Sequence, residues 1–376
     1  MNRIAFDAKR ITSNATGLGN YSRFVVEALA AFHSEHRYYL CSPGKGNPAL
    51  YSALQQREGI EWLLPEGRRM GGTFWRNFGV VPRLQKEGID LFHGLSHELP
   101  LGIYGKGIAT VVTIHDLIFI RYPHYYKPVD RLLYRLKYGH AARCADRVMA
   151  ISEQTKRDII DYLKVPESKI TVVYQGCHQA FKQTYTEAEK AAVRAKYHLP
   201  ERFVLNVGAI EPRKNALEIV KAIAPLPDLS LVLVGAQTAY YQQIVAYCKA
   251  HNLSDRVLAL KGVSMQELAM IYQQAEVFCY PSVFEGFGIP IIEALFSRVP
   301  VITSEGSCFA EAGGAHSCYI SLDKAADEIR EAIQRISSDR LLREEMIEKG
   351  YAHAQHFTDE AVYQQLMAVY KKIEQL

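Results

Sequence analysis

Short apolar runs alternate with amphipathic stretches from one end of the chain to the other. In the first half, the apolar runs predict strands near residues 2–7, 37–41, 89–93, 109–114, 147–151 and 170–173, and the amphipathic stretches predict helices near 20–32, 76–87, 130–144 and 153–163. In the second half, strands are expected at 203–207, 231–234, 257–259, 277–279 and 299–302, with helices near 214–224, 239–250, 265–274 and 289–297. This alternation is typical of α/β proteins with parallel sheets.

The alternation lapses once, in a polar and charged segment around residues 176–197. A chain of 376 residues is longer than one typical domain, so we place a boundary there and expect two doubly wound domains, at 1–180 and 181–356. The tail is helical and amphipathic from Ala325 onward, and Thr358 is a candidate N-cap for a last helix over 359–374.

Composition and charge narrow the classes of protein. No apolar stretch approaches the roughly 20 residues that span a bilayer, and Arg3–Asp7 is predicted to be a strand rather than a signal peptide, so a cytoplasmic protein is expected. The seven cysteines are scattered and show no zinc-ligand spacing, which indicates reduced thiols. Residues 1–175 hold 24 Lys and Arg against 16 Asp and Glu, whereas the remainder holds 20 against 24. The first half therefore favours an anionic partner.

Polar clusters follow four of the predicted strands. Ligands of open α/β sheets bind outside the carboxyl ends of the strands, so these clusters are the candidate sites. They are the turn Gly17-Leu-Gly19, the pair His115-Asp116, the segment from Gly208 to Asn215, and the loop that contains Glu285.

The loop around Glu285 carries the strongest signal. Pro290 is tolerated only near a helix start, so the helix is expected to begin close to Gly288 or Ile289. Free backbone N–H groups at that start suit an anion or a sugar hydroxyl. Glu285 and Glu293 lie close enough along the chain for both carboxylates to face one bound object, although two solvated surface glutamates are the alternative.

Arg213 and Lys214 are adjacent cations at a predicted helix N-terminus, where the dipole also favours an anion. They are a candidate diphosphate clamp, and a structural ion pair with Glu211 is the alternative. His115-Asp116 is a candidate sugar or acceptor contact, and a core histidine is its alternative. Gly17-Leu-Gly19 lacks the third glycine of a dinucleotide fingerprint, so it is either a phosphate contact or a plain turn.

The segment from Arg121 to Arg147 mixes basic residues with tyrosines. A solvated helix face with tyrosines packed on the sheet is one interpretation, and a surface for anionic lipid headgroups or a lipid diphosphate acceptor is the other. The chain contains no Asp-x-Asp and no cluster with recognisable metal spacing, so metal-independent chemistry is expected, with no cofactor and no nucleic-acid partner.

Taken together, these residues resemble the retaining glycosyltransferases of family 4, whose GT-B fold has two Rossmann-like domains that face a central cleft. The resemblance covers nearly the whole chain. Its most specific parts are the Glu-x7-Glu motif from Glu285 to Glu293 and the diphosphate-binding segment from Gly208 to Asn215. Supporting parts are Gly17-Leu-Gly19, His115-Asp116 and Val301–Ser304. One departure is Ala310, where family members often have proline.

The resemblance implies a role for each matching position. Arg213 and Lys214 would hold the donor diphosphate, Gly19 would approach the phosphate beside Gly17, and Gly208 would line the donor. Glu293 would accept from the ribose hydroxyls, and His115 would contact the sugar from the acceptor side. Glu285 would hold the transferred sugar together with the backbone of Gly286, Phe287, Gly288 and Ile289. The helix in 357–376 would cross back to the N-terminal, acceptor-binding domain.

The implied reaction moves a hexose from a nucleoside diphosphate sugar to a hydroxyl of a glycan or lipid-linked glycan. The chain looks most similar to bacterial O-antigen and capsule mannosyltransferases, which implies GDP-mannose, while UDP-glucose and UDP-N-acetylglucosamine stay open. Two other classes also stay open. They are a glycoside hydrolase that uses Glu285 and Glu293, and a non-catalytic nucleotide-sugar-binding subunit. Peripheral contact with the inner face of the cytoplasmic membrane is a further expectation.

Overall fold

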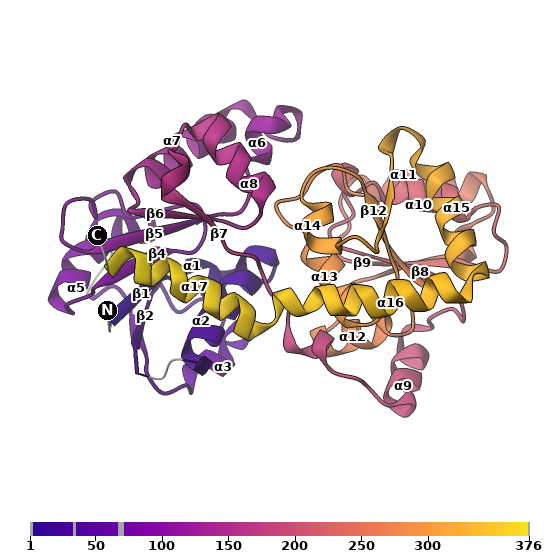
Figure 1. Ribbon diagram of the computed structural model, residues 1–376, viewed down its shortest axis with the longest axis horizontal. Coiled ribbons are helices and arrows are strands. Elements are labelled where there is room, and N and C mark those ends of the chain that lie inside the picture. Colours follow the sequence, from indigo (N-terminus) through magenta and orange to yellow (C-terminus); the bar gives the residue numbers. More distant parts are fainter. Residues whose placement is uncertain (1–2, 33–34, 67–70, 375–376) are drawn as a thin grey trace. The chain divides into compact units, whose positions relative to one another are not determined.

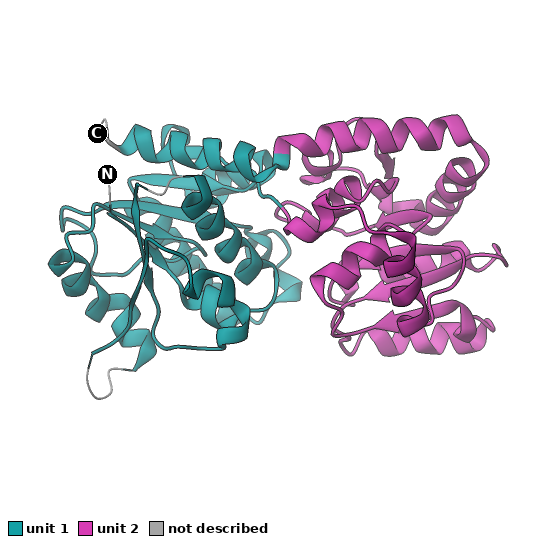
Figure 2. Ribbon diagram, turned by 90° about the horizontal axis from the view of Figure 1, so that it is seen from below, with its two compact units in different colours: residues 1–176, 357–376 teal, residues 177–356 magenta. Residues whose placement is uncertain are grey.

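The computed structural model describes residues 3–32, 35–66 and 71–374, and the chain divides into two compact units (Figures 1 and 2). Unit 1 comprises residues 1–176 and 357–376, and unit 2 comprises residues 177–356. The division after Gly176 lies four residues before the expected boundary at 180. No helix among the described residues is long and apolar enough to cross a membrane.

Unit 1 is built on a parallel sheet of seven strands in the order β3-β2-β1-β4-β5-β6-β7. The strands are β1 (Arg3–Asp7), β2 (Arg37–Cys41), β3 (Ile60–Leu63), β4 (Leu91–Gly94), β5 (Ala109–Ile114), β6 (Arg147–Ala150) and β7 (Ile170–Val172). Its helices are α1 (Lys9–Ser13), α2 (Gly17–Phe32), α3 (Ser52–Gln55), α4 (Gly72–Phe74), α5 (Val80–Lys86), α6 (Ile118–Arg121), α7 (Pro128–Cys144), α8 (Glu153–Asp158) and α17 (Asp359–Glu374).

The last helix, α17, completes the core of unit 1 (Figure 1). Val362, Leu366 and Val369 are fully buried and share a cluster with residues of α2. The Tyr370 hydroxyl lies 2.8 Å from Nδ1 of His93 on β4. Thr358 caps the helix as expected, because its hydroxyl accepts the N–H of Ala361 at 3.3 Å.

Unit 2 is built on a parallel sheet of six strands in the order β10-β9-β8-β11-β12-β13. The strands are β8 (Phe203–Val207), β9 (Ser230–Val234), β10 (Val257–Leu260), β11 (Val277–Tyr280), β12 (Val301–Ser304) and β13 (Cys318–Ile320). Its helices are α9 (Glu187–Tyr197), α10 (Ala216–Ile223), α11 (Tyr241–Ala250), α12 (Met265–Tyr272), α13 (Ile289–Phe296), α14 (Phe309–Gly313), α15 (Ala325–Ser338) and α16 (Arg340–Ala354).

The order of each sheet reverses once, between β1 and β4 in unit 1 and between β8 and β11 in unit 2. Connections leave in opposite directions at such a point, which opens a crevice at the carboxyl ends of the two strands. The doubly wound α/β fold expected from the sequence is therefore confirmed, and each unit has one preferred place for a ligand.

Candidate active site

Two loops meet at the reversal point of unit 2, one after β8 and one after β11. Gly208, directly after β8, has φ = 137°, which a residue with a side chain rarely adopts. The chain then forms a short 3-10 turn, Pro212–Lys214, and Asn215 takes a left-handed conformation (φ = 59°) before α10 begins at Ala216. This path places Arg213 and Lys214 opposite the loop that follows β11.

Arg213 and Lys214 converge on a single oxygen of Glu285. Oε1 of Glu285 lies 2.8 Å from Nη1 of Arg213 and 2.5 Å from Nζ of Lys214. Arg213 also pairs with Glu211 at 2.8 Å, so the structural alternative for this cation is present as well. The side chains of Arg213, Lys214 and Glu285 are only 16%, 12% and 12% exposed. Two cations therefore share one carboxylate that water scarcely reaches.

The charge of Glu285 is fixed by these neighbours. Burial alone would raise the pKa of this carboxyl, but the positive charges of Lys214 and Arg213 outweigh burial and lower the pKa to about 2. Burial would lower the pKa of Arg213, yet the same pairing raises it above its ordinary value. Glu285 is consequently ionised at neutral pH and neutralises part of the cationic cluster.

Three residues that the sequence did not single out hold this loop. Tyr280, the last residue of β11, is buried, and its hydroxyl contacts both Lys214 and, at 3.1 Å, Oε1 of Glu285. Ser307 and Cys308, which precede α14, donate to the backbone oxygen of Glu285 at 3.2 and 3.3 Å. A single tyrosine, serine or cysteine carries no signal in one sequence, and only the fold brings these three residues to Glu285.

The glycine loop continues into α13 as predicted. The helix begins at Ile289 with Pro290 in its first turn, and Gly288 adopts φ = 101° as the N-cap. Phe287 is 2% exposed and anchors the loop in the core, where its backbone oxygen accepts from Cys308 at 3.0 Å. The positive end of α13 therefore lies directly after Gly286, Phe287 and Gly288.

Glu293 lies in a different environment from Glu285. It is 9% exposed, and its Oε2 accepts from the hydroxyl of Tyr272, a residue of α12, at 3.1 Å. Burial raises the pKa of Glu293 to about 7, although the Tyr272 hydrogen bond opposes that rise. The two motif glutamates thus have different partners and opposite pKa shifts.

His115, at the end of β5 in unit 1, is a buried residue whose ring nitrogens both have protein partners. Nε2 lies 2.8 Å from the carbonyl oxygen of Leu95, so Nε2 carries the proton, and Nδ1 accepts from the side-chain amide of Gln175 at 3.1 Å. Burial lowers its pKa to about 4, so the ring is neutral at pH 7. Direct contact with a sugar would require one of these partners to be displaced.

Gly17-Leu-Gly19 was expected to form a turn ahead of a helix near 20–32, but these residues are the first turn of α2 itself. Gly19 is buried, and a Cβ on it would lie 1.8 Å from the carbonyl oxygen of Asn14. Gly17, by contrast, begins α2 in open space. Tyr21 of the same helix packs edge-on against His115 with ring centroids 4.6 Å apart. The start of α2 and His115 therefore belong to one local cluster at the carboxyl edge of the unit 1 sheet.

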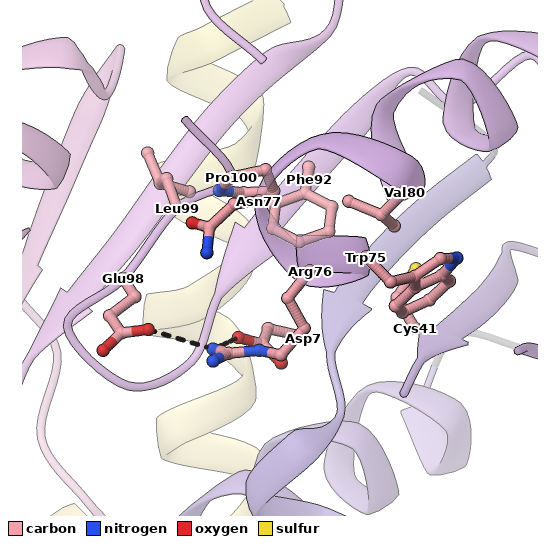
Figure 3. A pocket seen from close by; sticks show the side chains of 10 residues that line it. All are labelled: Asp7, Cys41, Trp75, Arg76, Asn77, Val80, Phe92, Glu98, Leu99 and Pro100. Carbon is pink, nitrogen blue, oxygen red and sulfur yellow. Dashed lines mark hydrogen bonds and ion pairs between the residues drawn. The ribbon is translucent and has the colours of Figure 1, made fainter. Parts of the chain in front are cut away.

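A small pocket lies at the reversal point of unit 1 (Figure 3). Arg76 is held there between two carboxylates, Asp7 at the end of β1 and Glu98, which lies 3.2 Å away. The cavity volume is about 10 Å³, which is room for one water molecule. This ion cluster was missed from the sequence because Asp7, Arg76 and Glu98 are far apart along the chain.

Comparison with known proteins agrees with this arrangement. Residues 15–180 match the family model described as Glycosyltransferase Family 4, and residues 189–353 match Glycosyl transferases group 1. The O-antigen chain mannosyltransferase B of Escherichia coli is 27% identical over 75% of this chain and 74% of its own length. The O-antigen chain mannosyltransferase RfbU of Salmonella typhimurium is 28% identical over 60% of this chain and 63% of its own length.

Among solved structures, HepE of Anabaena in complex with UDP-glucose superimposes with a TM-score of 0.77 at 17% identity over 100% of both chains. That likeness shows the GT-B fold. The two matched family models together cover most of both units, including all the residues of the cluster around Glu285. The chain is an enzyme of the glycosyltransferase class and belongs to family 4 of the glycosyltransferases.

Proposed function

We propose that this glycosyltransferase moves a hexose from a nucleoside diphosphate sugar to a hydroxyl of a glycan or lipid-linked glycan, with retention of anomeric configuration and without a metal ion. The observation that carries the proposal is the convergence of Arg213 and Lys214 on one oxygen of Glu285 at the reversal point of the sheet. These two scarcely exposed cations are balanced by Glu285 and Glu211, and their N–H groups point to one place where phosphate oxygens can take over as their partners, which suits a diphosphate.

The leaving group is the part of the reaction that this cluster serves. As the bond between the anomeric carbon and the diphosphate breaks, negative charge grows on the phosphate oxygens. Arg213, Lys214 and the N-terminus of α13 supply positive charge and N–H donors for it without any reorganisation. These groups would do the work that a divalent cation does elsewhere, which is why the proposal includes no metal.

The proposed acceptor step uses the leaving phosphate as the base. The bond between the anomeric carbon and the acceptor oxygen forms on the face that the phosphate leaves, and the acceptor proton passes to the departing phosphate oxygen. Glu285 is ionised and tied to two cations, and its pKa of about 2 makes it a weak base, so it is suited to hold the sugar hydroxyls rather than to take the acceptor proton. Neutral His115 lies in the other unit and stays a predicted sugar contact.

The donor is proposed to be GDP-mannose, because the relatives from E. coli and S. typhimurium are named as mannosyltransferases. The acceptor would then be a growing O-antigen-like glycan, and the enzyme would work in the cytoplasm at the membrane surface. HepE was solved with UDP-glucose, so UDP-hexoses belong in the same test. Membership of the glycosyltransferase family removes the hydrolase alternative.

The first experiment is a thermal-shift screen of GDP, UDP, ADP and their common sugar conjugates, with EDTA throughout. A shift selective for GDP compounds supports the proposed donor, and a shift selective for UDP compounds overturns it. Transfer of mannose to a glycan acceptor in the presence of EDTA supports the proposed acceptor and metal independence. An α-linked product from an α-linked donor, identified by NMR, supports retention of configuration. A β product or a requirement for added metal would overturn retention or metal independence respectively.

Lys214→Ala tests the site itself. It should lose transfer and most of the diphosphate-induced shift, because one charge-assisted phosphate contact contributes about 1.5–3 kcal/mol. Lys221→Ala is the matched control, since Lys221 pairs with Glu218 on the neighbouring helix α10 at 2.6 Å and lies outside the cluster. Normal turnover by Lys214→Ala would show that the donor diphosphate does not bind at this cluster.

A further inference from the structure

Helix α7 of unit 1 uses its tyrosines to pack against the core. Tyr134 and Tyr138 lie on the inner face, stacked on each other with ring centroids 5.4 Å apart, and both contact Phe119 edge-on. Ala141 and Ala142 continue this face and are fully buried. Tyr134 and Tyr138 are thus explained by packing, and the interpretation of the basic and aromatic segment must rest on its exposed residues.

The outer face of α7 is apolar as well. Val129, Leu132, Leu133 and Leu136 are 69%, 60%, 48% and 60% exposed. Their spacing of three, four and seven residues places them on one stripe, because consecutive residues of an α-helix are turned by about 100°. The stripe covers an arc of about 100° and a rise of about 10 Å. The solvent side of a surface helix is ordinarily polar, so this stripe marks an interaction surface.

Cations border the stripe. Arg135 lies on one side of it and Lys137 on the other, Arg143 continues it toward the C-terminal end, and exposed Lys127 precedes the helix. Between Arg121 and Arg147 the sequence holds seven Lys and Arg against two Asp and Glu. Tyr125, 36% exposed, adds an aromatic side chain just before the helix.

We propose that the stripe of Val129, Leu132, Leu133 and Leu136 docks α7 into the headgroup region of an anionic lipid bilayer. An interfacial helix lies in the plane of the membrane, buries its apolar side by about 5–10 Å, and places cations at the headgroup level. The four apolar side chains and their cationic borders match both requirements. A second copy of the chain fits the stripe less well, because it would bring the same excess of cations to the same interface.

The consequence for the enzyme rests on the proposed function. A bound α7 would hold unit 1 at the surface where a lipid-linked acceptor lies, while the donor cluster around Glu285 in unit 2 stays independent of the lipid. Vesicle binding and nucleotide binding are therefore separable properties. A chain that does not bind vesicles can still bind nucleotide, and the reverse also holds, so each proposal is tested by its own measurement.

The test is co-sedimentation of the full chain with vesicles, made either of phosphatidylcholine alone or of equal parts of phosphatidylcholine and phosphatidylglycerol. The wild type should bind the anionic vesicles and release in high salt. Leu132→Ser with Leu136→Ser should weaken that binding at least about tenfold, since two exposed leucines lose their transfer into the interface. Arg135→Glu should weaken binding to anionic vesicles only.

Leu341→Ser is the matched control, because Leu341 of α16 in unit 2 is 78% exposed and lies outside the stripe. It should bind vesicles as the wild type does. The double variant must keep the nucleotide-induced thermal shift of the wild type, which shows that it is folded. Absence of wild-type binding to anionic vesicles, or equal binding by the double variant, overturns the proposal. If the wild type is a dimer that does not bind vesicles, and the double variant is a monomer, the stripe would be assigned to contact with a second copy of the chain.

Discussion

Glu285→Gln removes the one charge that Arg213 and Lys214 share and keeps the size of the side chain. In the wild type, both cations contact Oε1 of Glu285, at 2.8 and 2.5 Å, and neither is more than 16% exposed. The variant leaves two scarcely solvated cations close together without this counter-ion. The expected result is a less stable protein in the absence of donor and a stronger response to diphosphate.

The size of the loss can be worked out in two independent ways. A pKa of about 2 in place of the ordinary 4.5 corresponds to about 3 kcal/mol of stabilisation at neutral pH. Because the folded pKa lies below the unfolded one, this stabilisation is complete above about pH 4.5 and is lost as the pH falls toward 2. The second estimate comes from buried ion pairs in general, which cost about 3–5 kcal/mol to break. Because the cluster around Glu285 is partly exposed, we expect the lower end of that range, which agrees with the estimate from the pKa.

The assay is thermal and urea unfolding of unit 2 within the full chain at pH 7, with and without GDP and UDP. About 3 kcal/mol corresponds to a lowering of Tm by about 6–12 °C for a unit of this size. The control is Glu348→Gln, since Glu348 pairs with Arg298 on the surface and should cost less than about 1 kcal/mol. Unchanged stability at pH 7, or no gain in the diphosphate-induced shift over the wild type, would refute the reasoning.

Three further predictions follow from buried groups and close contacts. Glu293→Gln should raise stability by up to about 3 kcal/mol at pH 8 and by little at pH 4.5 in urea unfolding, because the wild-type pKa near 7 makes ionisation costly as the pH rises through it. Gly19→Ala should cost about 1–3 kcal/mol from its clash with a backbone carbonyl, whereas Gly17→Ala, in open space, should cost nothing measurable by the same method. Arg76→Met should lower stability by about 3 kcal/mol in thermal unfolding, because it leaves two carboxylates without their shared cation.

Most of the fold could be predicted because apolar runs and amphipathic stretches alternate so regularly. Two strands were missed, β3 (Ile60–Leu63) and β13 (Cys318–Ile320), which are the short edges of their sheets and have one neighbour each. The strand expected at 299–302 begins instead at Val301, because Pro300 has no N–H to give to the ladder. The helix expected at 76–87 is interrupted, with a π turn over Trp75–Gly79 before α5.

The candidate site could be predicted only as far as its motifs reach. The helix start close to Gly288 and the place of Pro290 in its first turn follow from local sequence, and the structure confirms them. The ion pair of Arg213 with Glu211, which was the alternative to a diphosphate clamp, is also present. Tyr280 and Tyr272 could not be found, because each looks like an ordinary core residue until the fold places it beside a carboxylate. Ala310 lies in the first turn of α14, a position that proline also tolerates, so this departure leaves the helix intact.

The contrast between the two motif glutamates shows what the fold adds to the spacing. A spacing of eight residues places both carboxylates near one helix start but says nothing of their charge. The cations after β8 keep Glu285 ionised, whereas Glu293 has a tyrosine and the core for neighbours, and its pKa rises to about 7. Glu285 is therefore a permanent counter-ion of Arg213 and Lys214, and a bound diphosphate must either displace it from these cations or share them with it. Glu293 can change charge near neutral pH, so a ribose hydroxyl that donates to it would favour the ionised form and couple donor binding to proton release.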